Sequence, residues 1–280
     1  MLNTEEAKQI ALFANSIRCE TLKCIASKGV GHVGGSLSIA DVLAVLYKKE
    51  MRIDPKNPKM EDRDFLVVSK GHSGPAVYGT LALMGFFPKE KLSTLNKLGT
   101  DLPSHCDMRK TPGIDMTTGS LGQGASAACG IAYGNKLKGL DNYTYAIFGD
   151  GEIEEGQVWE AAMFAGHRKL DHLIFFVDNN GLQIDGTVND MCSLDDIAAK
   201  FEPFGLFAQT VNGHDVSEIY DAIEKAKAAK MPSVIFLKTV KGYGVSRFAG
   251  NISCHSTAVT PEILDEALKE LAEARKDLEA

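Results

Sequence analysis

The chain has 280 residues, 44% of them hydrophobic, and a formal net charge of −7 at pH 7. This length and composition suit one sizeable α/β domain with a large buried core. The negative charge disfavours nucleic acid or a membrane surface as the main partner, because both are usually bound by a basic face.

The N-terminus and the cysteines indicate the cellular environment. The first segment, MLNTEEAKQIALFANSIRCETLK, has no uncharged apolar run long enough for a signal peptide or a membrane span. The six cysteines are dispersed, and none forms a CxxC pair of the kind found in zinc ribbons and redox sites. We therefore expect a soluble, cytoplasmic protein with reduced thiols.

The first part of the chain predicts two helices, then a strand that turns into a third helix. Ile10, Phe13 and Ile17 follow helical spacing, and this helix should end at the glycines of SKGVGHVGG. A second helix is predicted over 36–47, where Ser38 and Asp41 fit a capping box. The apolar run 65–69 (FLVVS) predicts a buried strand that leads into a helix over 69–85.

The rest of the chain alternates strands with helices. Residues 111–134 predict a glycine-rich loop feeding a helix of small residues. Strands are then predicted at 143–148, 172–177, 206–211 and 233–239, with helices at 158–169 and 217–230. Residues 267–280 predict a charged, solvated helix. This alternation indicates an α/β fold with a mostly parallel sheet and helices on both faces.

Polar residues follow two of the predicted strands. Asp150 lies in a GDG turn after strand 143–148, and Asn180 follows strand 172–177. Ligands of such sheets bind beyond the carboxyl ends of the strands, so both oxygens, with the carbonyl of Leu182, can converge on one cation. Carboxylate, amide and carbonyl oxygens suit Mg²⁺ or Ca²⁺. Either motif alone is typical of an ordinary turn, and their joint occurrence is more specific.

The pattern of GDG followed by NN resembles the thiamine diphosphate motif, in which a metal ion bridges the protein to a diphosphate. The resemblance extends over residues 1–280 to the N-terminal, diphosphate-binding domain of transketolases. The segments GHVGGSLS, SKGHSGPAVY, TTGSLGQG, GDGEIEEG, VDNNGLQIDG and GYG...CHS occur in the order of that family. The resemblance implies a thiamine diphosphate-binding fold.

The resemblance also implies roles for individual residues. The metal ligands would be Asp150, Asn180 and the Leu182 carbonyl. Contacts to thiamine diphosphate would come from His72, Gly119, Leu121, Gly151, Glu152, Asn180, Ile184 and His255, with Gly151 and Glu152 acting through backbone N–H groups. The catalytic set would be His32, His105, His255 and Glu155, with Glu155 at an interface that links active sites.

The histidines divide into two groups by their sequence context. His32 and His105 match the family histidines that face the sugar, where neutral imidazole can exchange protons with hydroxyl groups. The surroundings of His105, LPSHCDMRK, depart from the usual His-Pro pairing of the family. We expect structural roles for the three remaining histidines, His167, His172 and His214.

The implied activity is reversible transfer of a two-carbon ketol group from a ketose phosphate to an aldose phosphate. Full-length transketolases continue into pyrimidine-binding and C-terminal domains, so the chain looks like the N-terminal subunit of a split transketolase. We expect a C-terminal partner subunit to supply those domains in an assembly with two copies of each chain. The apolar faces that the partner would cover should make the isolated subunit self-associate.

Several alternatives share the same motifs. The α subunit of a 2-oxo acid dehydrogenase and a deoxyxylulose phosphate synthase use related scaffolds, although the histidine set favours transketolase over the dehydrogenase. A specialised transketolase could act on another sugar phosphate or a sulfosugar. A non-catalytic subunit could also keep the cofactor site for assembly alone.

Overall fold

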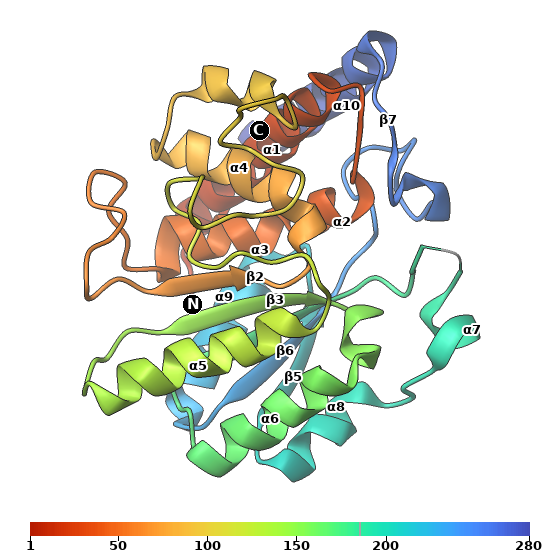
Figure 1. Cartoon of the computed structure of the whole chain (residues 1–280). Coiled ribbons are helices and arrows are strands. Elements are labelled where there is room, and N and C mark those ends of the chain that lie inside the picture. Colours follow the sequence, from red (N-terminus) through yellow and green to blue (C-terminus); the bar gives the residue numbers. More distant parts are fainter. Residues whose placement is uncertain (185) are drawn as a thin grey trace.

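The centre of the molecule is a parallel β-sheet (Figure 1). The computed structural model describes residues 1–184 and 186–280, so Asp185 of the VDNNGLQIDG segment lies outside the described residues. Within those residues the sheet has five strands in the order β2-β3-β4-β6-β5. The strands are β2 (Phe65–Val68), β3 (Thr144–Gly149), β4 (Leu173–Asn179), β5 (Phe207–Asn212) and β6 (Ser233–Lys238). The predicted strands and the predicted parallel sheet are therefore confirmed.

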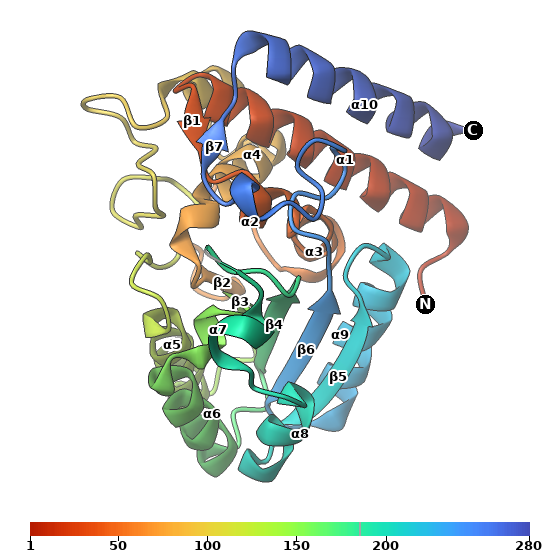
Figure 2. The same ribbon diagram turned by 90° about the vertical axis from the view of Figure 1, so that its right-hand side faces the viewer.

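Helices cover both faces of the sheet (Figures 1 and 2). One face carries α5 (Gln123–Leu137), α6 (Gly156–Arg168) and α8 (Ile197–Phe201). The other face carries α1 (Thr4–Ala26), α3 (Ala40–Val45), α4 (Gly74–Met84) and α9 (Val216–Ala229). The last helix, α10 (Pro261–Glu279), runs along the outside of α1 (Figure 2).

Two hydrophobic clusters lie on the two sides of the sheet. In β4, Ile174 and Phe176 belong to the cluster under α1, α3 and α4, whereas Phe175 and Val177 belong to the cluster under α5 and α6. Successive strand residues point to opposite faces, so a strand that is covered on both sides needs an unbroken apolar run. This explains why the sequence LIFFV shows no alternation of polar and apolar residues.

The strand order reverses between β4 and β6. The chain leaves β4 toward α8 on one face, reaches β5 at the edge of the sheet, and crosses the other face through α9 before returning as β6 beside β4. Connections thus depart to opposite faces beyond the carboxyl ends of β4 and β6, which opens a crevice in this fold class. Asn180 and Thr239 directly follow these two strand ends.

Two local predictions were wrong. Ser38 and Asp41 form no capping box, because α3 starts at Ala40 without a side-chain cap and the Ser38 hydroxyl donates to Asp178 instead. The segment predicted as one helix over 36–47 is divided among α2 (Gly34–Leu37), α3 and a π-helical turn over Leu46–Glu50. The charged, solvated helix predicted over 267–280 is present as part of α10, but it is amphipathic, and its Ala267 and Leu271 are buried in the core cluster that includes α1.

Among the described residues, none of the helices combines the length and the apolarity that a membrane span requires. Cytoplasmic localisation stays a prediction. Within the same residues, all six cysteines are free, as the sequence suggested.

Candidate functional site

A cavity of about 290 Å³ opens at the carboxyl ends of the central strands. Its walls come from loops that follow β2, β3 and β4, from the loop before α5, and from segments near both ends of the chain. Every predicted site residue except Glu155 is part of its lining: His32, His72, His105, Gly119, Leu121, Asp150, Gly151, Glu152, Asn180, Leu182, Ile184 and His255. Residues far apart in the sequence therefore meet in one place.

The oxygen atoms predicted to bind a metal lie on two neighbouring turns. Asp150 follows β3 and is 2% exposed, and its two carboxylate oxygens accept the N–H groups of Gly151 (2.9 Å) and Gly181 (2.5 Å). The Asn180 side-chain oxygen accepts the N–H of Leu182 at 3.1 Å. The bond from Gly181 to Asp150 joins the turns after β3 and β4, and the other two bonds shape each turn locally.

The electrostatics of these turns suit a bound cation. Burial, together with the neighbouring carboxylate of Asp178, raises the pKa of Asp150 to about 6. A divalent cation beside Asp150 would favour its charged form. No group of three or more His, Cys, Asp or Glu side chains within residues 1–184 and 186–280 could hold a metal. The predicted donors, one carboxylate with amide and carbonyl oxygens, instead suit Mg²⁺ or Ca²⁺.

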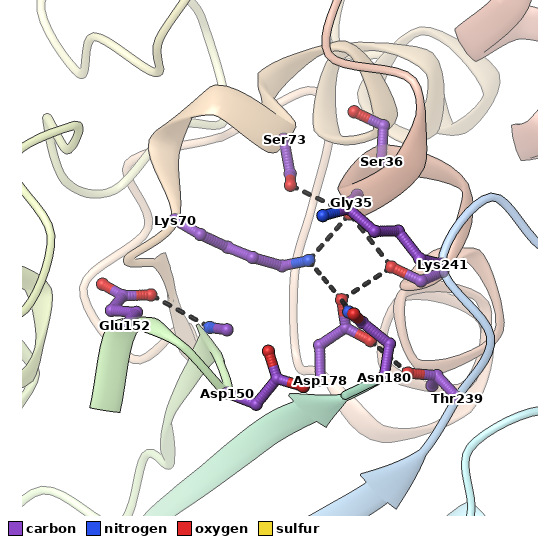
Figure 3. A network of polar contacts seen from close by, with 12 residues as sticks. Gly35, Ser36, Lys70, Ser73, Asp150, Glu152, Asp178, Asn180, Thr239 and Lys241 are labelled. Atoms are coloured by element: carbon purple, nitrogen blue, oxygen red, sulfur yellow. Dashed lines mark hydrogen bonds and ion pairs between the residues drawn. The ribbon is translucent and has the colours of Figure 1, made fainter. Parts of the chain in front are cut away.

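A buried lysine of the cavity lining, which the sequence motifs did not predict, joins two segments around the cavity (Figure 3). Lys70 is 2% exposed and donates to the carbonyl of Gly35 at 2.7 Å and to Asp178 at 2.5 Å. The hydroxyls of Ser38 and Thr239 also donate to Asp178. Although burial opposes it, Lys70 lowers the pKa of Asp178, so this carboxyl stays ionised.

A second buried lysine follows β6. The Lys241 ammonium donates to the carbonyls of Leu182 (3.2 Å) and Gln183 (3.0 Å), and burial lowers its pKa. Lys70 places positive charge in the cavity lining, and Lys241 places it behind the lining residues Leu182 and Gln183, in a chain whose net charge is −7. Their signal in the sequence was a lysine inside each of two glycine-rich segments, SKGHSG and VKGYG.

Glu152 fastens the glycine-rich loop to the end of β3. Its carboxylate accepts the Ser69 hydroxyl (2.5 Å), the Gly122 N–H (2.9 Å) and the Gly149 N–H (3.0 Å). The side chain is 3% exposed. Because these bonds join β2, β3 and the loop before α5, the buried carboxylate has a positioning role in addition to the contact predicted for its backbone N–H.

The glycine-rich loop requires a glycine beside the histidines. Gly119 has a φ of 150°, and a Cβ there would lie 3.1 Å from the His105 ring. A side chain at this position would have to displace that ring. Leu121, two residues later, and Ile184 are 37% and 60% exposed, so the cavity has apolar lining that is open to solvent.

Four histidines form a cluster in the cavity. The ring of His32 lies 5.1 Å from His72, 5.9 Å from His105 and 5.4 Å from His255, measured between centroids. The two-stranded ribbon of β1 (Val30–Gly31) and β7 (Thr257–Ala258) brings the segments of His32 and His255 together. Neither short strand was predicted, because the pairing joins opposite ends of the chain.

Burial keeps the best-enclosed histidines neutral. The pKa of His72 falls to about 2 because of burial and the positive charge of Lys70. The pKa of His32 is lowered by burial and by His105. Near neutral pH each of these neutral imidazoles can accept a hydrogen bond at one ring nitrogen and donate one at the other.

The remaining candidates lie outside this cavity. Glu155 is exposed at the N-cap of α6, so the structure does not bring it to the other predicted catalytic residues. His172 stacks on Tyr143 with ring centroids 4.5 Å apart, and His214 is bonded to Asp41. Neither of these two histidines belongs to the described lining of the cavity, and their structural roles stay predictions.

Comparison with known proteins identifies the family. The model of the transketolase thiamine diphosphate-binding domain matches residues 9–274. The chain belongs to the transketolase family. The resemblance seen in the motifs is thus confirmed, and the fold is that of the thiamine diphosphate-binding domain of transketolases.

Relatives of this transketolase domain fall into two length classes. It is 55% identical to the 6-deoxy-6-sulfo-D-fructose transketolase subunit SqwG of Clostridium sp. (strain MSTE9), over 92% of this chain and 94% of that protein. It is 35% identical to an apulose-4-phosphate transketolase subunit of Phocaeicola vulgatus, over 98% of both. The solved transketolase of Campylobacter jejuni matches with a TM-score of 0.90 and 32% identity, over 94% of this chain but only 43% of that one.

Proposed function

We propose that this chain is the cofactor-binding subunit of a two-chain transketolase. The two-chain enzyme transfers a two-carbon ketol group reversibly from a ketose phosphate to an aldose phosphate. The observation that carries the proposal is the convergence of the metal-type oxygens, the buried Lys70 and the four histidines on one cavity of a transketolase-family domain.

In this proposal the two strand-end turns hold the metal and the diphosphate. Asp150, Asn180 and the Leu182 carbonyl bind Mg²⁺ (or Ca²⁺), and His72, His255 and the N–H groups of Gly151 and Glu152 bind the diphosphate. Lys70 and Lys241 offset its negative charge. Gly119, Leu121 and Ile184 line the cofactor rings. Thiamine diphosphate, when bound, supplies the carbon nucleophile for ketol transfer.

In this proposal the histidines contact the sugar substrate. His32 and His105 exchange protons with its hydroxyl groups, and His255 lies between the diphosphate and the sugar. The neutral state that burial imposes on His32 supports this role. Glu155 acts at a contact between active sites, a role for which its exposure leaves it accessible.

A second polypeptide completes the active site. This chain spans less than half of the Campylobacter transketolase, and its relatives of matching length are named as transketolase subunits. We propose that the partner supplies the pyrimidine-binding domain and that the assembly contains two copies of each chain. Exposed Leu121 and Ile184 provide apolar surface for the partner to cover, and for self-association when it is missing.

A sulfosugar is a second candidate donor. It is supported by the 55% identity to a subunit named for 6-deoxy-6-sulfo-D-fructose, compared with 35% to a subunit named for apulose 4-phosphate. The chemistry at the cavity would be the same for both donors, because a sugar phosphate and a sulfosugar differ only at the end of the sugar that is remote from its carbonyl.

A coupled assay of the reconstituted two-chain enzyme tests these proposals. Fructose 6-phosphate, xylulose 5-phosphate and 6-deoxy-6-sulfo-D-fructose would be compared by kcat/KM with one aldose phosphate acceptor. Turnover of any ketose that depends on thiamine diphosphate supports ketol transfer, and the ranking identifies the donor. Cofactor binding without turnover of any donor would instead support a non-catalytic subunit.

A further inference from the structure

His214 lies just outside the cofactor cavity and is bonded on both ring nitrogens. Its Nδ1 is 2.8 Å from the Asp41 carboxylate, and its Nε2 accepts the backbone N–H of Val240 at 2.8 Å. The ring also stacks on Tyr243, with centroids 3.5 Å apart and planes 11° from parallel. The side chain is 8% exposed. His214 therefore joins α3 to the segment that follows β6.

These contacts require one neutral tautomer. A nitrogen that accepts a backbone N–H carries no proton, so the ring proton lies on Nδ1 and is donated to Asp41. Asp41 remains ionised because Arg18, although burial opposes it, lowers its pKa. The ring contacts Asp41 from α3 and Tyr243, and Arg18 from α1 pairs with that Asp41 and lies over the Tyr243 ring. Protonation of Nε2 would break the bond to Val240.

Residues 239–244, here called the Lys241 segment, contact residues of the cavity lining on either side of that bond. Thr239 donates its hydroxyl to Asp178, and Lys241 donates to the carbonyls of Leu182 and Gln183. Val240 lies between them, and its side chain is 40% exposed, so burial does little to hold it. The bond from its N–H to His214 is the contact that anchors this residue from the side of α3.

We propose that His214 is a positioning residue for the cofactor site: it holds the Lys241 segment so that Thr239 and Lys241 stay against the turn after β4. The residue acts through the segment and does not line the cavity itself. This inference rests on the proposed cofactor site.

Hydrogen exchange of the isolated chain tests the anchor without any cofactor. In His214→Ala, the amides of residues 239–244 should exchange about tenfold faster, because one buried hydrogen bond and the stacking are lost. His214→Gln keeps a side-chain acceptor of similar reach and should restore part of the protection of Val240. His172→Ala is the matched control, because it also removes a histidine stacked on a tyrosine, but at the opposite end of the sheet.

Cofactor affinity tests the functional consequence in the two-chain enzyme. His214→Ala should weaken binding of thiamine diphosphate with Mg²⁺ about tenfold, and His172→Ala should leave it unchanged. If His214 acts through Lys241, the double variant with Lys241→Ala should bind no more weakly than Lys241→Ala alone. Effects that multiply with Lys241→Ala, and also with Thr239→Ala, would show that His214 acts independently of both residues and would overturn the proposal.

Two controls keep the outcomes distinct. Nitrogen-15 NMR of the wild-type chain reports the tautomer, so a proton on Nε2 at neutral pH would overturn the inference even if the His214 variants did not fold. If the wild-type enzyme bound no thiamine diphosphate, the proposed function would be wrong. Hydrogen exchange and NMR would still show whether His214 anchors the Lys241 segment. Normal cofactor affinity in His214→Ala, beside tight wild-type binding, would refute the positioning role alone.

Discussion

Two buried aspartates at opposite ends of the sheet have similar bonding but different surroundings. Asp64 precedes β2, is 5% exposed, and accepts the N–H groups of Arg52 (2.8 Å) and Tyr143 (2.7 Å). Asp150 follows β3, is 2% exposed, and also accepts two backbone N–H groups. Burial raises the pKa of both carboxyls. Only burial and hydrogen bonding are shared, so these features alone do not identify a functional carboxylate.

The difference lies in what each carboxylate faces. Asp150 lines the cavity and is adjacent to a second carboxylate, Asp178, which raises its pKa further. Burial raises the pKa of Asp64, and the nearby Arg52 offsets only part of this rise; the bonds of Asp64 join the segments before β2 and β3. A buried acid beside a like charge at a cavity wall indicates a site for a cation. A buried acid that only accepts backbone N–H groups indicates a structural role, in which the carboxylate joins two segments of the chain.

The largest expected effect comes from Asp150→Ala. This change should abolish metal-dependent binding of thiamine diphosphate, a loss of at least about 100-fold, since even outer-shell partners of a metal contribute about 10- to 100-fold. Calorimetry with Mg²⁺ and cofactor measures it, and Asp150→Asn serves as a variant of nearly equal volume. Wild-type affinity in a folded Asp150→Ala protein would show that the metal assignment is wrong.

Substitution of the sugar-facing histidines should act on turnover. His32→Ala and His105→Ala should each lower kcat of the reconstituted enzyme about 10²- to 10⁴-fold, the usual contribution of a general acid or base. Their melting temperatures should change little, and His167→Ala, in the last turn of α6, is the control for loss of a histidine. Unchanged turnover would return either residue to a structural role.

The pH dependence of cofactor binding should follow Asp150. Its pKa of about 6 means that the metal must displace a proton in more acidic solution, so affinity should fall about tenfold per pH unit below pH 6. Because the pKa of Asp150 is raised from 3.8 to about 6 on folding, between these two pH values the folded metal-free chain keeps a proton on Asp150 that the unfolded chain releases. This group therefore lowers stability as the pH rises from 3.8 to about 6, and adds no further change above it. Calorimetry from pH 5 to 8 that found constant affinity would contradict this assignment.

The smallest effect on cofactor binding is expected at the other end of the sheet. Asp64→Asn leaves one of two backbone N–H groups facing an amide donor, which should cost about 1–3 kcal/mol of unfolding free energy. Cofactor affinity measured at a temperature where the variant is folded should be unchanged. Urea unfolding beside calorimetry separates the two quantities, and a selective loss of cofactor affinity would break the contrast with Asp150.

Local patterns predicted the five strands of the parallel sheet and most helices, whereas most of the predicted cavity residues came from the resemblance of the motifs to the transketolase family. Apolar runs such as LIFFV identify strands because burial on both faces leaves no place for polar side chains. Contacts between distant residues could not be predicted in this way. The Ser38 hydroxyl has a local capping partner in the sequence, yet the fold directs it to Asp178, and the bond between His214 and Val240 depends on how two loops pack. The glycine-rich segments around Lys70 and Lys241 draw attention to these lysines, but no sequence pattern separates a buried lysine from an exposed one.

Hydrogen–deuterium exchange at C2 of thiamine diphosphate tests the central claim most directly. In transketolases, a glutamate of the pyrimidine-binding domain promotes removal of this proton, and we propose that the partner subunit supplies it. With saturating cofactor and Mg²⁺, this chain alone should leave the exchange rate near that of free cofactor, and addition of the partner should accelerate it strongly. Rapid exchange by this chain alone would place the activating group within its 280 residues and would contradict the two-chain account.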